Sequence, residues 1–143
     1  MTSELVFEGM QSALRSKFKT CALYHMVLQA FGPVRPFKDL LKIEIKYRMV
    51  LAGLARCYAI PEPRDDWEGQ VAIPVSFIEA CEEAIDLERG NDELYAGVLG
   101  RMEDPALCRV LKQIRNVSQI SHLPSFKDYL EFARFGEKRG INF

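Results

Sequence analysis

Four apolar stripes in this sequence are each interrupted by one ionisable residue, and these residues are the candidates for chemistry. At helical spacing the interrupting residues are Lys17, Glu44, Glu88 and His122. If the helices pack together, the four side chains lie at one level of the core. Carboxylates and a histidine that converge inside a helical bundle are the groups that chelate metal ions there. The sequence therefore predicts a buried polar layer with the potential to bind metal.

Each interrupting residue needs a helix to carry it, and the periodicity predicts four helices. Gly32-Pro33 ends the first, because proline cannot continue a helix. Ser76 and Asp104 are suited to cap the third and fourth helices. Pro124 is expected to kink or end the fourth helix, and the tail after Glu131 to lie on the surface. The predicted helices cover about residues 4–31, 38–58, 75–102 and 105–130.

The long gap between the second and third predicted helices indicates how they connect. Residues 59–74 contain three prolines and a glycine, so this segment is not helical. A connection of this length can run along a whole bundle, whereas the short breaks at 32–36 and 103–105 join antiparallel neighbours. We therefore expect one all-α domain over residues 1–143, with two antiparallel helical hairpins joined by a long crossover.

Composition excludes several classes of partner. The 19 basic residues nearly cancel the 20 acidic residues, so no basic field is present to bind nucleic acid or an anionic membrane surface. No run of 18 uncharged apolar residues suggests a membrane span. The N-terminus lacks the pattern of a secretory signal, and the four cysteines form no C-x-x-C pair. These features predict a cytoplasmic protein with reduced thiols.

The residues around the polar layer resemble a known set of ligand motifs. The matching runs are Lys17-x-x-Thr20-x-x-x-Tyr24, Glu44-x-x-Tyr47, Glu88-x-x-Asn91-x-x-x-Tyr95 and Gln119-x-x-His122. Over about residues 10–130 the chain resembles rubrerythrin-type members of the ferritin-like superfamily, without the rubredoxin domain. The resemblance implies a ferritin-like four-helix bundle, a homodimer and descent from proteins with a di-iron carboxylate site.

By the same resemblance, only half of the expected metal ligands are present. Glu44, Glu88 and His122 match the pattern, while Lys17, Tyr47 and Gln119 stand at the other three ligand positions. A lysine ammonium thus replaces a bridging acid. We expect a metal-free bundle in which Lys17 bridges the two glutamates. In that arrangement Tyr47, Gln119 and His122 hydrogen-bond the remaining carboxylate lone pairs, and no cofactor is needed.

The alternative is a single iron or manganese ion held by Glu44, Glu88 and His122. This arrangement requires a neutral Lys17, which burial favours. An oxidoreductase that reduces peroxide or dioxygen, or a protein that handles iron, would depend on such an ion. Whether the protein is an enzyme stays open at this point.

Other ionisable and apolar residues have simpler interpretations. His25 is expected at the surface, because it lies about 80° around the helix from Lys17. Buried cysteine usually behaves as a small apolar residue, although Cys21 or Cys81 could face the polar layer. Two further groups are expected on the surface: a solvated acidic run of Glu79, Glu82, Glu83 and Asp86, and apolar residues suited to a dimer contact, including Trp67, Ile73 and Phe143.

Overall fold

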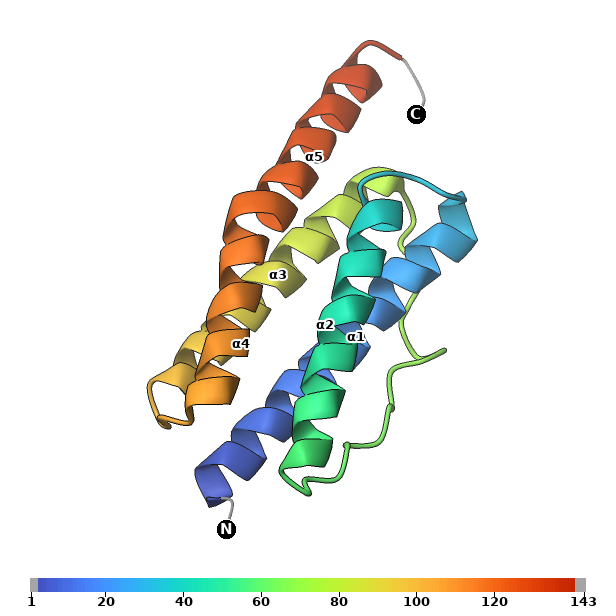
Figure 1. The fold of residues 1–143 in the computed structure, drawn as a ribbon. Coiled ribbons are helices and arrows are strands. Elements are labelled where there is room, and N and C mark those ends of the chain that lie inside the picture. The colour runs from blue at the N-terminus through green and yellow to red at the C-terminus, as the bar shows by residue number, and fades with distance from the viewer. Residues whose placement is uncertain (1–2, 141–143) are drawn as a thin grey trace.

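The structure is a computed structural model, and it describes residues 3–140. Over this range the chain is all-helical and forms an elongated bundle (Figure 1). The last three elements follow one another without a break and form one long rod. The elements are α1 (Glu4–Phe31), α2 (Phe37–Cys57), α3 (Phe77–Leu99), α4 (Pro105–Val117), the π-helical turn η1 (Ser118–His122) and α5 (Leu123–Lys138).

Side-chain caps begin three of the helices. The hydroxyl of Ser76 accepts the backbone N–H of Glu79 at 3.1 Å, and a carboxylate oxygen of Asp104 accepts that of Leu107 at 3.0 Å. Both predicted N-caps are therefore confirmed. Ser3 caps α1 in the same way. These contacts satisfy backbone donors that have no partner inside the helix.

The rod formed by α4, η1 and α5 is disturbed next to Pro124, but it is longer than predicted. The helix does not end at Pro124, and it continues to Lys138 rather than to the expected end at residue 130. Ala133 and Gly136, in the tail that was expected on the surface, are buried. The backbone N–H of Leu123 bonds the carbonyl of Ser118, five residues earlier. This wider turn accommodates the missing N–H of proline without ending the helix.

The apolar core consists of two clusters with the polar layer between them. Toward the N-terminal end of α1 the core includes Leu14, Leu51 and Leu111. Toward its other end, Phe37 and Phe126 pack with the ring of Tyr24, with ring centres 5.0–5.5 Å apart. On each helical rod the polar residue lies in sequence between members of the two clusters. The bundle therefore holds Lys17, Glu44, Glu88 and His122 at its middle.

The connection from α2 to α3 runs back along the bundle beside α1 (Figure 1). The side-chain amide of Gln11 donates to the carbonyl of Pro61 at 3.1 Å, and Arg48 pairs with Asp65 at 3.4 Å. The Lys19 ammonium lies 4.8 Å from the ring centre of Trp67. The crossover is thus attached to the helices at several points.

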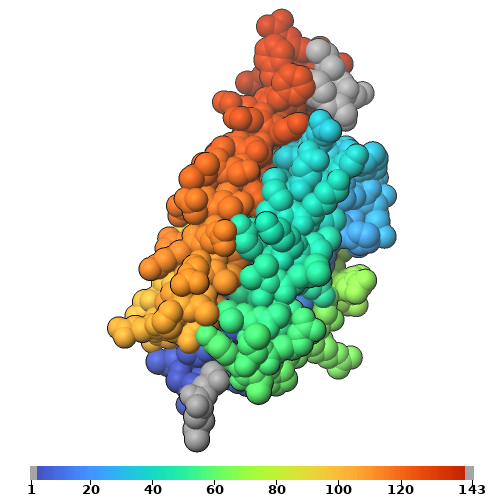
Figure 2. All heavy atoms as spheres, viewed as in Figure 1, coloured from blue at the N-terminus to red at the C-terminus, as the bar shows by residue number. Residues whose placement is uncertain are grey.

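The far end of α5 extends past the other helices (Figure 2). Phe132 and Phe135 there are 57% and 54% exposed. Among residues 3–140, no helix has the length and apolar character that crossing a membrane requires.

Candidate functional site

A buried ion pair between α1 and α2 occupies one side of the polar layer. Nζ of Lys17 donates a hydrogen bond to Oε2 of Glu44 at 2.7 Å. The two side chains are only 2% and 1% exposed. The ammonium also lies 5.4 Å from the ring centre of Tyr95, within the range of a cation–π contact. Lys17 therefore points into the core rather than toward solvent.

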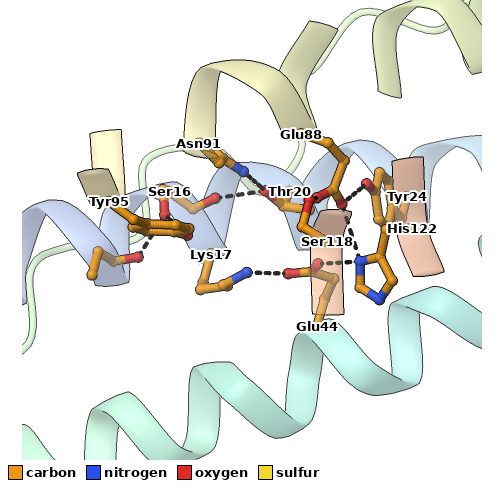
Figure 3. A network of polar contacts seen from close by, with 11 residues as sticks. Ser16, Lys17, Thr20, Tyr24, Glu44, Glu88, Asn91, Tyr95, Ser118 and His122 are labelled. Carbon is orange, nitrogen blue, oxygen red and sulfur yellow. Dashed lines mark hydrogen bonds and ion pairs between the residues drawn. The ribbon is translucent and has the colours of Figure 1, made fainter. Parts of the chain in front are cut away.

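His122 connects this pair to the second carboxylate. Its Nδ1 lies 3.1 Å from Oε1 of Glu44 and 3.3 Å from Oε1 of Glu88, so the imidazole bridges α2 and α3 (Figure 3). Nε2 of the same ring is buried and has no hydrogen-bond partner in the described part of the chain.

Glu88 receives two further hydrogen bonds from hydroxyl groups. The Tyr24 hydroxyl donates to Oε1 at 2.5 Å, and the Ser118 hydroxyl donates to Oε2 at 2.6 Å. With Lys17 and His122 on Glu44, all four carboxylate oxygens of the layer have a polar partner. The layer thus satisfies its own buried acceptors, as burial requires.

A second set of polar contacts lies beside the layer, between α1 and α3 (Figure 3). The Ser16 hydroxyl contacts the Tyr95 hydroxyl. The side-chain amide of Asn91 donates to the Thr20 hydroxyl at 2.8 Å, and Thr20 donates to the carbonyl of Ser16 at 2.8 Å. The contact with Ser16 fixes the hydroxyl end of the Tyr95 ring, which lies next to the Lys17 ammonium.

The electrostatics of the layer keep its groups charged. Burial alone lowers the pKa of Lys17, but the charges of Tyr95, Glu44 and Glu88 and the hydrogen bond to Glu44 raise it well above 10.5. Burial raises the pKa of Glu88, yet His122, Lys17 and Ser118 lower it to about 2. Burial also lowers the pKa of His122, and its contacts with both glutamates raise it to about 9. Lys17 and His122 are therefore cationic and Glu88 is ionised at neutral pH.

The π-helical turn determines which residues of the last rod reach the layer. A turn closed by a bond between residues five apart holds one more residue than an α-helical turn. Ser118 and His122, which are both buried, face Glu88 from the two ends of this turn. Gln119 is exposed instead and donates to Asp92 at 3.1 Å. Gln119 therefore does not line the layer, contrary to the sequence-based expectation, which assumed α-helical spacing.

The remaining site predictions have mixed outcomes. The structure brings Lys17, Glu44, Glu88 and His122 together in the core, as expected. Of the two glutamates, Lys17 hydrogen-bonds only Glu44 within residues 3–140, so it does not bridge both. Tyr47 is buried in the apolar cluster around Leu51, and none of the hydrogen bonds to the two carboxylates within residues 3–140 comes from it.

Two hydroxyl donors take the roles expected of Tyr47 and Gln119. They are Tyr24 and Ser118, which both bond Glu88. The sequence contains a signal for each of them. Tyr24 lies seven residues after Lys17, two helical turns along the same face, and Ser118 lies on the apolar stripe of its helix. What the sequence lacks is an indication of which carboxylate each hydroxyl would meet.

Glu44, Glu88 and His122 are also the residues that could hold a metal ion. One ligand atom from each lies within 4.8 Å of the others, and the three residues are buried. No other such group of three occurs among residues 3–140. Carboxylate oxygens with one imidazole nitrogen suit iron or manganese. In the structure, however, the carboxylate oxygens and Nδ1 of His122 are already engaged with Lys17, Tyr24, Ser118 and one another, and Nε2 of His122 is the possible ligand atom without a partner among residues 3–140.

Two buried cysteines, His25 and the acidic run lie outside the polar layer. Burial raises the pKa of the Cys21 thiol to about 11 and that of Cys81 to about 12, so both stay protonated and unreactive at neutral pH. His25 is exposed, as expected. In the acidic run, Glu82 pairs with Arg134 of α5 at 3.2 Å, and both side chains are about half exposed.

Comparison of the chain with family models, with curated proteins and with solved structures finds no match. Any function must therefore be inferred from the geometry of the polar layer and of the molecular surface.

Proposed function

We propose that this protein is a ferritin-like, rubrerythrin-related bundle that works without metal, as a non-enzymatic helical scaffold. In this proposal its two antiparallel hairpins descend from a di-iron protein, and a buried ion-pair network replaces the metal ions. The observation that carries the proposal is the 2.7 Å contact between Nζ of Lys17 and Oε2 of Glu44, both fully buried. An ammonium group stands where a metal cation would otherwise neutralise the carboxylate.

The charge balance supports this proposal. Glu44 and Glu88 contribute two negative charges, and Lys17 and protonated His122 contribute two positive charges. A divalent ion added to this neutral group would leave two uncompensated positive charges in the core. Uncompensated buried charge is strongly unfavourable.

A pair of metal ions does not fit these residues. Two divalent ions need about four carboxylates to balance them, and the layer has Glu44 and Glu88 alone. Lys17 adds a further repulsive charge. Chemistry that requires a di-iron centre therefore has no basis in this residue set.

The second candidate is an oxidoreductase or iron-handling protein that uses a single iron or manganese ion. The observation in its favour is the closeness of the ligand atoms of Glu44, Glu88 and His122, which all lie within 4.8 Å of one another. Binding would require Lys17 and His122 to lose their protons. The raised pKa values of both residues oppose that loss.

Metal analysis of the purified protein tests the two candidates. After growth with added iron and manganese, we expect less than about a tenth of an equivalent of either metal, and thermal unfolding that a chelator does not change. Lys17→Glu should increase metal uptake, because it restores a carboxylate and removes the ammonium. Adding Glu88→Gln to that variant is the matched control and should reduce the uptake again. Close to one equivalent in the native protein, lost on Glu88→Gln, would establish the second candidate instead.

The proposal includes a cytoplasmic homodimer. Cys21, Cys57, Cys81 and Cys108 are all free thiols, which supports a reducing compartment. Trp67 and Ile73 are 37% and 61% exposed and supply apolar surface for a dimer contact. Phe143, the third residue expected there, lies outside the described residues. Sedimentation velocity at tens of micromolar should show a dimer, and a monomer at every concentration would contradict this part of the proposal.

A further inference from the structure

A groove of about 760 Å³ lies between α1, α3 and the crossover. Its apolar lining comes from all three segments. Gly90 of α3 also lines it, and a side chain there would meet no other atom within 4 Å, so the groove is open at this position. The apolar lining residues are Leu23, Trp67, Val71, Ala72, Leu87 and Leu94.

The two helical walls of this groove carry opposite charges. Arg15 and Lys19, one turn apart on α1, form a basic wall, and Glu83 and Asp86 on α3 form an acidic wall. Within residues 3–140 none of these four side chains forms an ion pair. Burial and the nearby Glu79 and Asp86 raise the pKa of Glu83. Lys19 lies against the Trp67 ring and Glu83 bonds Glu79, so neither contact supplies an opposite charge, and a charged ligand group could pair with either wall.

Polar groups between the walls add hydrogen-bonding capacity. Ser16 and Asn91 both line the groove. The amide nitrogen of Asn91 is engaged with Thr20, which leaves its side-chain carbonyl oxygen as an acceptor. A ligand that suits the groove therefore has an anionic end, a cationic end, an apolar middle and amide groups.

We propose that this groove binds short peptides with free termini. The peptide carboxylate lies between Arg15 and Lys19, the α-ammonium lies against Glu83 and Asp86, and apolar side chains contact the lining near Trp67. Thr20 of α1 bonds Asn91 of α3, so Asp86 lies about 9 Å along the helix axes from the level of Lys19, in addition to the 8–10 Å between packed axes. An extended chain advances about 3.3–3.6 Å per residue, so three or four residues connect the two walls. This inference does not depend on whether the polar layer binds metal.

Trp67 provides a direct assay, because it is the one tryptophan of the chain and lines the groove. We would titrate the protein with the tripeptide Ala-Leu-Ala and follow Trp67 emission together with the amide NMR signals of Gly90 and Asn91. We expect saturable changes. The N-acetylated and the C-amidated forms of the same peptide should each bind at least about tenfold more weakly, since each lacks one charged end.

Variants of each wall identify which charge is recognised. Arg15→Gln with Lys19→Gln should abolish the preference for a free carboxylate but keep the preference for a free ammonium, and Glu83→Gln with Asp86→Asn should do the reverse. All four side chains reach the surface or its edge, so the fold should tolerate these changes, and a circular dichroism spectrum checks that it does. Equal binding of the three peptides, or no saturable change in the NMR signals at millimolar peptide, would overturn the proposal.

Discussion

The Lys17 side chain makes the largest individual contribution to the charge balance of the core. It supplies the direct partner of Glu44, and its charge also lowers the pKa of Glu88. Its ammonium is more than nine-tenths buried, so water cannot replace it if it is removed. A buried carboxylate that loses its partner is far more costly than an exposed one.

We therefore expect Lys17→Met to lower the free energy of unfolding by about 3–5 kcal/mol, because it leaves Glu44 without its cation. The matched control is Lys42→Met on α2, where the exposed lysine should contribute within about 0.5 kcal/mol. Urea denaturation of both variants measures the difference. Equal, small losses in the two variants would mean that the ion pair is not formed in solution.

His122 gives the stability of the protein a dependence on pH. Burial lowers its pKa, but Glu44 and Glu88 outweigh burial and raise it from 6.5 to about 9. A group with a raised pKa contributes its full stability below 6.5 and loses it as the pH rises through 9. The free energy of unfolding should therefore fall over this window by up to about 3 kcal/mol.

His122→Gln is the comparison for that titration, because it keeps a polar side chain of similar size without the charge. Urea denaturation at intervals from pH 6 to pH 9 should give a flatter profile for the variant than for the native protein. Glu88 behaves in the opposite sense: its lowered pKa contributes stability that is lost as the pH falls from 4.5 toward 2. Parallel profiles of the two proteins above pH 6.5 would exclude a charged His122.

Helical periodicity was sufficient to predict the four charged residues of the layer, but not all of their partners. Lys17, Glu44, Glu88 and His122 each interrupt an apolar stripe, and a residue in a stripe faces the core. Gln119 was wrongly assigned to the layer, because a uniform α-helical register omits the extra residue that the π-helical turn holds. In the structure Gln119 lies at the surface and bonds Asp92. Such a turn depends on tertiary packing, which local sequence rules do not describe.

The π-helical turn is the element that adapts the last rod to the rest of the bundle. Before it, Leu111 and Ile114 pack in the first apolar cluster. After it, Phe126 and Leu130 pack in the second. Pro124 was expected to disturb the helix, and the caps at Ser76 and Asp104 were predicted from residue type alone. The extension of the helix from residue 130 to Lys138 was not, because it depends on the burial of α5 against α3.

Adding one residue to this turn should be more harmful than changing one. The π-helical turn already holds one residue more than an α-helical turn, so an alanine inserted after Ile120, which is 69% exposed, would rotate α5 by about 100° relative to α4. Either Ser118 or the face that carries Phe126 must then leave the core, at a cost of about 3–5 kcal/mol if Phe126 is lost. Ile120→Ala is the matched control and should cost less than about 0.5 kcal/mol. Thermal unfolding compares the two, and similar midpoints would show that the register of α5 relative to α4 is not required for packing.

At the scale of the whole molecule, the polar layer divides the core and links all four helical rods. Each rod contributes one charged residue, and each of these residues contacts at least one other rod. Slippage of one rod by a turn would move a charge into an apolar cluster, at a large cost in free energy. We therefore expect the layer to fix the relative heights of the rods, in addition to any effect on stability.

If the charges of the layer balance one another, removing an oppositely charged pair should cost less stability than the two single removals added together. Lys17→Met and Glu44→Gln should each destabilise the bundle, because each leaves an unbalanced charge in the core. Together they leave Glu88 facing protonated His122, which is again neutral. The double variant should therefore be more stable than the sum of the single losses predicts, by about 0.5–3 kcal/mol. Urea denaturation of the native protein and the three variants gives this coupling energy directly. Strictly additive losses would mean that Lys17 and Glu44 contribute independently, and the replacement of metal ions by an ion-pair network would then lose its main physical support.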